Sequence, residues 1–140
     1  MPGGRQVTRI TLEEAKNWLH AYGQAWVAGD PSAAVRLFHP DAEYQETPFS
    51  KAMRGSEEIR RYWQEGAADS QEDVTFSYDL WSVSGNEVHA GWTARFRRTA
   101  NRAVVELDGV FRLTFDRRSG VLRCSGLREW WHLREVRDAS

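Results

Sequence analysis

The clearest pattern of apolar and polar positions lies in residues 104–132, where two apolar runs flank a polar turn. In the first run apolar residues alternate with charged or polar ones, and the apolar positions are Val105, Leu107, Phe111, Leu113 and Phe115. A period of two predicts a strand with one buried face and one exposed face. Gly120 can supply the positive φ that a hairpin turn often needs, so we expect a β-hairpin here.

The second apolar run places a carboxylate on an apolar face. Leu127, Glu129 and Trp131 share one parity, whereas Trp130 and His132 share the other. Burying a carboxylate among apolar side chains is costly unless the group is paired or protonated. Glu129 is therefore the first candidate for a functional residue.

Helical spacing appears after Thr11, which forms a capping box with Glu14. The apolar positions that follow recur at helical spacing, and they are Leu12, Ala15, Leu19, Tyr22 and Trp26. This pattern predicts a helix over residues 12–28, which ends at Gly29.

Two more helices are predicted in the first half of the chain. Asp30 is a good cap and Pro31 a good first residue for a short helix, which we expect to end at Pro40. Ser56 is predicted to cap a third helix, and the buried face of that helix comprises Ile59, Tyr62 and Trp63.

The remaining pattern completes an α+β architecture. Residues 42–46 form a short predicted strand before Pro48, residues 64–73 are polar and loop-like, and residues 74–80 and 88–97 alternate as strands. The expected order is helix, helix, strand, helix and then four antiparallel strands, with the helices on one face of a curved sheet. We expect one domain over residues 1–140, with an ordered core at about 9–136.

Composition and charge exclude several classes of protein. A chain of 140 residues with 41% hydrophobic content suits one domain with one core. A net charge of −1 favours neither nucleic acid nor an anionic membrane as partner. The start, MPGGRQVTRI, has no apolar segment, so we expect no secretory signal, and the apolar runs are shorter than the ~20 residues of a membrane span. Cys124 is the single cysteine, which excludes an internal disulfide, and a cytoplasmic location follows by default.

Metal, cofactor and phosphate sites have no sequence signal here. The four histidines, at positions 20, 39, 89 and 132, lack metal-ligand spacing, and no glycine-rich phosphate loop is present. We therefore predict no metal and no cofactor. A basic cluster at Arg95, Arg97, Arg98 and Arg102 is best explained by cross-strand salt bridges to Glu106 and Asp108.

The chain resembles the nuclear transport factor 2-like, or SnoaL-like, superfamily over nearly its whole length. The segments that carry the resemblance are AYGQAWVAGDPSAAVRLFHPDAEYQETPF, RGSEEIRRYW, LDGVFRLTFDRRSGVL and GLREWWHL. The resemblance implies a cone-shaped fold, with a strongly curved mixed or antiparallel sheet and three helices on its concave face. Because this fold hosts enzymes, binding proteins and adaptors, the activity remains open.

Three enzyme branches of that superfamily can be compared by position. Ketosteroid isomerases have a helix-one tyrosine and a base carboxylate before a proline, which fall on Tyr22 and Glu46, although Thr47 separates Glu46 from the proline. The second acid of the isomerase oxyanion hole corresponds to Gly109 in this chain, so that acid is absent here. Limonene epoxide hydrolases have an arginine and an aspartate on a middle strand and a second aspartate on the last strand. Only the last of these three positions has an acid here, Glu129. SnoaL-type polyketide cyclases use one acidic base, which this sequence does not assign to a single residue.

Together these features predict a cavity with aromatic walls that binds a small apolar molecule. We expect Trp26, Trp63, Trp92, Phe111 and Trp131 to bind the ligand, with Glu46, Glu129 and Tyr22 as the catalytic set. A buried carboxylate could remove a proton next to a carbonyl, and a tyrosine could stabilise the enolate, as in an isomerase or cyclase.

Structural roles remain alternatives for the same residues. Glu46 could bind a backbone N–H or an arginine at the end of its strand, and Glu129 could pair with Arg123 or Arg95. The aromatic residues could be plain core. The alternative function is then a non-catalytic module that binds a ligand or a protein.

The outer face of the predicted sheet is a candidate interface. Parity places on it Thr93, Arg95, Val110, Trp130 and His132. An exposed tryptophan beside a valine on an open sheet face marks a contact surface. The family resemblance implies a homodimer about a two-fold axis through that face.

Overall fold

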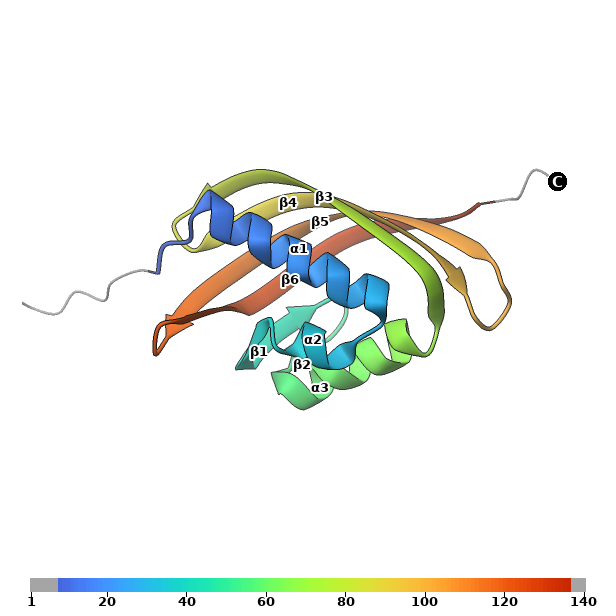
Figure 1. Ribbon diagram of the computed structural model, residues 1–140, viewed down its shortest axis with the longest axis horizontal. Coiled ribbons are helices and arrows are strands. Elements are labelled where there is room, and N and C mark those ends of the chain that lie inside the picture. The colour runs from blue at the N-terminus through green and yellow to red at the C-terminus, as the bar shows by residue number, and fades with distance from the viewer. Residues whose placement is uncertain (1–7, 137–140) are drawn as a thin grey trace, which may run out of the picture.

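Helices cover one face of a long, curved sheet in the computed structural model, which describes residues 8–136 (Figure 1). The helices are α1 (Leu12–Ala28), α2 (Pro31–Val35) and α3 (Gly55–Trp63), and a π-helical turn at Gln64–Ala68 extends α3. The strands are β1 (Phe38–Gln45), β2 (Met53–Arg54), β3 (Gln71–Ser84), β4 (Glu87–Arg98), β5 (Val104–Arg118) and β6 (Val121–Val136). Within the described residues, no helix is long and apolar enough to cross a membrane.

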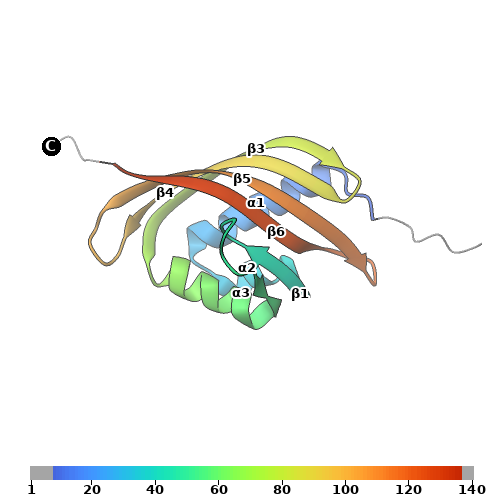
Figure 2. The same ribbon diagram turned by 180° about the vertical axis from the view of Figure 1, so that it is seen from behind.

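The sheet is mixed, with the strand order β2-β1-β6-β5-β4-β3. All neighbouring pairs are antiparallel except β1 and β6, which are parallel. Seen from behind, the long strands arch over the three helices, which lie in the concavity (Figure 2). The predicted α+β fold and the hairpin of residues 104–132 are therefore confirmed.

The second helix is shorter than the sequence predicted, and Pro40 does not end it. α2 stops at Val35, and β1 already begins at Phe38. Pro40 is tolerated in this strand because the β1–β6 register shifts between Phe38 and Glu43, so its missing N–H interrupts no regular ladder.

Three local predictions were wrong at element ends. The N-cap of α3 is Arg54 and has no side-chain cap, so Ser56 does not cap this helix. Residues 64–73 are not a loop, because they form the π-helical turn and the start of β3. Leu12 is 61% exposed and lies outside the buried face of α1.

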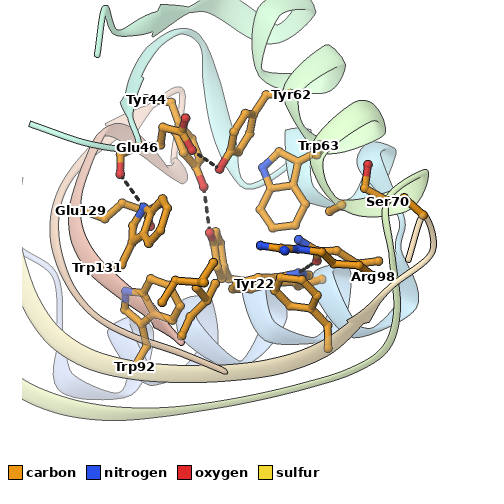
Figure 3. A pocket seen from close by; sticks show the side chains of 18 residues that line it. Tyr22, Tyr44, Glu46, Tyr62, Trp63, Ser70, Trp92, Arg98, Glu129 and Trp131 are labelled. Atoms are coloured by element: carbon orange, nitrogen blue, oxygen red, sulfur yellow. Dashed lines mark hydrogen bonds between the residues drawn. The ribbon is translucent and has the colours of Figure 1, made fainter. Parts of the chain in front are cut away.

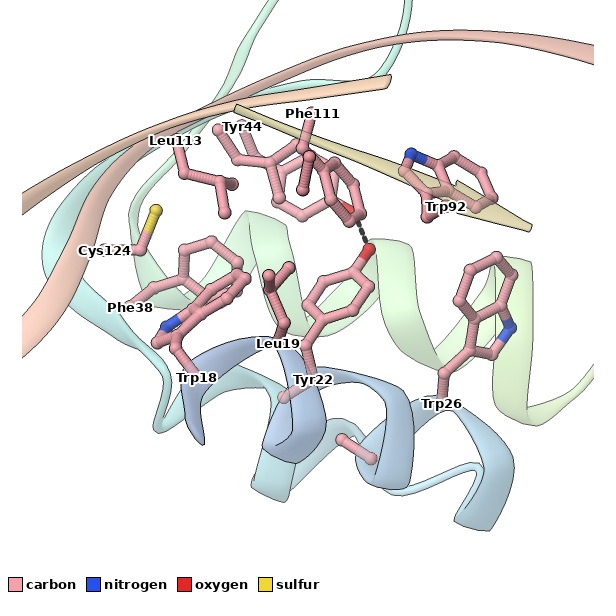
Figure 4. Close-up of a cluster of buried hydrophobic side chains, with 14 of the residues drawn as sticks. Trp18, Leu19, Tyr22, Trp26, Phe38, Tyr44, Trp92, Phe111, Leu113 and Cys124 are labelled. Carbon is pink, nitrogen blue, oxygen red and sulfur yellow. Dashed lines mark hydrogen bonds between the residues drawn. The ribbon is translucent and has the colours of Figure 1, made fainter. Parts of the chain in front are cut away.

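An aromatic cluster between α1 and the sheet forms the core beside the site (Figure 4). The ring of Tyr22 stacks on Trp18 at 5.3 Å and meets Trp63 and Phe111 edge-on at 5.3 and 5.2 Å. Edge and stacked aromatic pairs add to the stability gained from apolar burial. Cys124 is fully buried, and burial raises the pKa of its thiol to about 12, which makes it unreactive.

Candidate functional site

One cavity of about 440 Å³ opens between α1, α3 and the inner face of the sheet (Figure 3). Its aromatic walls comprise Tyr22, Trp26, Tyr44, Tyr62, Trp63, Trp92, Phe96 and Trp131, and its carboxyl groups are those of Glu46 and Glu129. Every predicted site residue except Phe111 lines this cavity. Phe111 is fully buried behind the wall, where its ring stacks on Trp92 at 5.2 Å.

Gly109 allows the Trp92 ring to form the wall of the cavity. Gly109 lies between Trp92 and Trp131 in the sheet register. A Cβ atom at Gly109 would lie 2.5 Å from two atoms of the Trp92 indole, closer than real Cβ contacts. The position where the isomerase pattern has an acid is therefore covered by an aromatic ring.

Glu129 is the most deeply buried carboxyl group of the site. It is 4% exposed, and its Oε2 atom has no hydrogen-bond partner among the described residues. Within residues 8–136 it forms no ion pair, so the predicted pairing with Arg123 or Arg95 does not occur. Burial, and secondarily the charge of Glu46, raises the pKa of Glu129 well above the usual value. Glu129 therefore keeps its proton at a pH where an exposed glutamate is ionised.

Glu46 follows β1 and is held in place from two sides. The Tyr62 hydroxyl donates to its Oε2 at 2.8 Å, and the Trp131 indole N–H donates to its backbone oxygen at 2.8 Å. The predicted structural partner, an arginine or a backbone N–H, is not found among the described residues. Since only one of its carboxylate oxygens has a donor among residues 8–136, the group keeps capacity to accept a proton from a ligand.

A pair of tyrosine hydroxyl groups lies beside the carboxyl groups. The Tyr22 and Tyr44 hydroxyls are 2.9 Å apart, and both side chains are buried. Burial, and then the charge of Glu129, raises the pKa of both phenols. Both hydroxyls therefore remain protonated and can donate hydrogen bonds.

Tyr44 and Tyr62 are site residues that the sequence interpretation missed. Tyr44 shares its strand parity with Glu46, so the alternation in residues 42–46 contained this signal. Tyr62 was assigned to the core face of its helix, and helical spacing alone does not separate a cavity wall from a packed core.

Three buried polar atoms lack a hydrogen-bond partner among residues 8–136, and all three belong to the cavity lining. They are Nε1 of Trp63, Nε1 of Trp92 and Oε2 of Glu129. Leaving such a group unpaired costs about 1–3 kcal/mol. A molecule in the cavity could supply hydrogen-bond partners to all three groups.

The described residues contain no group of three or more His, Cys, Asp or Glu side chains placed to hold a metal ion. The polar groups of the cavity are instead the carboxyl, phenol and indole groups at one end, and the side chains of Ser70, Gln71 and Arg98. This set can move protons and donate hydrogen bonds to an oxygen.

Solved structures define the class of this fold. They include a nuclear transport factor 2-like superfamily protein from Salmonella enterica, at 16% identity and TM-score 0.73 over 84% of this chain and 88% of that chain. A hexachlorocyclohexane dehydrochlorinase, LinA-type3 from Novosphingobium barchaimii, matches at 13% identity and TM-score 0.73 over 89% and 88%. The epoxide hydrolase/cyclase-like enzyme SalBIII matches at 19% identity and TM-score 0.74 over 89% and 97%.

At these identities the likeness concerns the fold, which is the cone fold of the nuclear transport factor 2-like superfamily. Within it, this chain belongs to the SnoaL-like domain family, whose model matches residues 19–121. A comparison with curated proteins gave no match.

Proposed function

We propose that this protein is an acid/base catalyst that removes a proton from a carbon next to a carbonyl group, as an isomerase or cyclase does. The observation that carries the proposal is the meeting of Glu46 and Glu129 in one aromatic cavity, where Glu129 has an unpartnered oxygen. Two carboxyl groups in different environments can serve as base and acid at the same pH.

In this mechanism Glu46 is the base and Glu129 the acid. Glu46 takes the proton from carbon, and the electron pair moves to the carbonyl oxygen to give an enolate. Protonated Glu129, with the Tyr22 hydroxyl, donates hydrogen bonds to that oxygen. Where a carbon–carbon double bond is conjugated with the enolate, return of the proton from Glu46 to the far carbon of that double bond shifts the double bond and completes an isomerisation. Tyr62 orients Glu46 through its 2.8 Å hydrogen bond.

Solved structures with the same fold support the proposed type of protein, an enzyme, but not the roles of particular residues. A protein named as a dehydrochlorinase and one named as an epoxide hydrolase/cyclase-like enzyme share this fold. Enzymes are thus found on this fold, while the site residues of this chain are its own.

Exchange of a carbon-bound proton tests the first step before any natural substrate is known. With 2-tetralone in D₂O, we expect the wild-type protein to accelerate deuterium uptake at the α-carbon, followed by NMR. Glu46→Gln should lower the rate about 100-fold or more, because general-base catalysis is worth at least that much. Tyr22→Phe should lower it less, because Glu129 still donates to the oxygen.

Glu43→Gln is the matched control, since Glu43 is exposed on β1, the strand that precedes Glu46, and pairs with Arg54. It should exchange protons at the wild-type rate. Equal rates for the wild type and Glu46→Gln would contradict the catalytic proposal.

A non-catalytic binding module is the second candidate, favoured by the unpartnered indole N–H groups of Trp63 and Trp92. In that case Trp92→Ala or Trp131→Ala would abolish binding of 2-tetralone. The wild-type protein would then catalyse no exchange, and Glu46→Gln would bind as the wild type does.

A further inference from the structure

The cavity has a second polar end, opposite the carboxyl groups. Arg98, at the end of β4, lines the cavity together with Ser70 and Gln71, the latter its register partner on β3. Glu129 on β6 pairs with Phe111 on β5, which pairs with Ala90 on β4. Arg98 lies eight residues after Ala90 along β4, so it is far from Glu129 along the strands. Figure 3 shows the guanidinium beside Trp63, across the cavity from Glu46 and Glu129.

The guanidinium of Arg98 is only partly used by the protein. Its Nη1 contacts Glu135 at 3.1 Å, and the two side chains are 35% and 58% exposed. This pair replaces the predicted salt bridge to Glu106 or Asp108. Among residues 8–136 the guanidinium donates to no other side chain, although an arginine has five N–H donors. An exposed pair of this kind contributes little stability, so a ligand can compete for or share the arginine.

Arg98 does not neutralise the carboxyl end of the cavity. Neither Glu46 nor Glu129 lies within salt-bridge distance of it among the described contacts. The walls between the two ends are apolar, and they comprise Trp26, Trp63, Trp92, Phe96 and Leu107. The cavity is therefore polarised, with a cation at one end, an aromatic middle and acidic groups at the other end.

We propose that the substrate is an oxo acid whose carboxylate and reacting carbonyl are separated by an apolar ring body. The carboxylate binds Arg98, because the planar guanidinium matches it with two parallel hydrogen bonds. The ring body lies between the aromatic walls, and the carbonyl reaches Glu129 and Tyr22. Repulsion between the carboxylate and Glu46 disfavours the reverse orientation. This inference rests on the proposed function and names its substrate class.

Three naphthalene probes separate the contributions of the two ends: 2-naphthol, 6-hydroxy-2-naphthoate and the methyl ester of that acid. The hydroxyl group stands in for the enolate oxygen, and only the acid offers a carboxylate to Arg98. By titration calorimetry at pH 6, we expect the acid to bind wild-type protein about tenfold or more tightly than the ester, as a charge-assisted pair implies.

Variants of Arg98 assign that preference to the residue. Arg98→Met should remove the preference for the acid while 2-naphthol binds as before. Arg98→Lys should restore part of it, since lysine keeps the charge without the planar fork. Arg134→Met is the matched control, because Arg134 is an exposed arginine of the neighbouring region that pairs with Glu106, and it should keep the preference.

The outcomes distinguish this inference from the proposed function. The oxo-acid proposal is contradicted if the wild type binds acid and ester equally, or if Arg98→Met still prefers the acid. Either result leaves the catalytic proposal unaffected. Failure of all three probes to bind overturns both. A preference lost in Arg98→Met and kept in Arg134→Met supports the inference.

Discussion

At the scale of single residues, Glu129 occupies an environment that is costly for a carboxyl group. Its carboxyl group is buried among aromatic side chains, faces the charge of Glu46 and has an unpartnered oxygen. A protein selected for stability alone would replace such a group with an apolar side chain. The cost is explained when the group must hold a proton and donate it to a ligand.

The raised pKa of Glu129 predicts how stability depends on pH. Because the folded pKa exceeds the unfolded value, the stabilising contribution is complete below the unfolded pKa of about 4.3 and is lost as pH rises through the folded pKa. Glu129→Gln removes this loss. The variant should therefore gain stability over wild type as pH rises, by about 1.4 kcal/mol for each unit by which folding raises the pKa.

Urea unfolding of both proteins between pH 4 and pH 9 measures this difference. Glu43→Gln serves as control, since the exposed Glu43 should leave the pH profile unchanged. A constant difference between wild type and Glu129→Gln across the range would show that Glu129 titrates normally.

The site was predictable where strand parity decides burial. Parity placed Glu129, Trp92 and Trp131 on the inner face, and all three line the cavity. Parity also placed Phe111 there, but which inward side chain reaches the cavity and which lies behind another ring depends on packing across strands. The ring of Trp92, accommodated by Gly109, decides this for Phe111.

At the scale of the elements, the predicted N-caps are confirmed for Thr11 of α1 and Asp30 of α2, and the predicted cap at Ser56 of α3 is wrong. Thr11 accepts from the Glu14 backbone N–H at 3.0 Å, and the Glu14 side chain accepts from the Thr11 N–H at 3.1 Å, which completes the capping box. Ser56 is also a residue type that favours an N-cap, but Ile59 stands three residues on, where a capping box needs Glu or Gln. It makes no cap, because the helix begins one residue earlier, at Gly55 with a φ of 83°.

Two serine or threonine substitutions test this difference. Thr11→Ala should lower the free energy of unfolding by about 1 kcal/mol, the usual value of an N-cap. Ser56→Ala should change it by less than about 0.5 kcal/mol, because the Ser56 side chain does not cap α3. Chemical denaturation measures both, and equal losses would contradict the assigned caps.

The arrangement of β1 could not be predicted from its own residues. Its parallel pairing with β6 and the shifted register around Pro40 depend on a strand that lies far along the chain. Local alternation specifies a strand and its buried face but not its partner. The four long strands were predictable because consecutive antiparallel strands usually pair.

At the scale of the whole molecule, the outer sheet face carries an apolar stripe across four strands. Trp81 packs over Gly91, and Gly91, Val110 and Trp130 are register neighbours on β4, β5 and β6. Trp81 is 56% exposed and Trp130 38% exposed. Charged residues flank the stripe, with Arg128 on one side and Asp108 on the other. In a face-to-face dimer whose two-fold axis runs along the stripe, the Arg128 side of one chain would face the Asp108 side of its partner.

We therefore expect a homodimer through this face. Sedimentation at micromolar concentration should give twice the chain mass for wild type, and Trp130→Glu should give a monomer, because it buries a charge in the contact. Val121→Glu is the control, since Val121 is 48% exposed at the β5–β6 turn and outside the stripe. A wild-type monomer, or an unchanged mass for Trp130→Glu, would contradict the dimer.

The central claim is that Glu129 acts as a neutral acid beside Glu46 in an aromatic cavity. NMR titration of the glutamate side-chain carboxyl carbons tests it most directly, with the Glu129 signal assigned by its loss in Glu129→Gln. We predict that Glu129 titrates well above ~4.3, and that Glu46→Gln lowers its pKa because a neighbouring negative charge is removed. A Glu129 signal that titrates near ~4.3 in the wild type, unaffected by Glu46→Gln, would contradict the account.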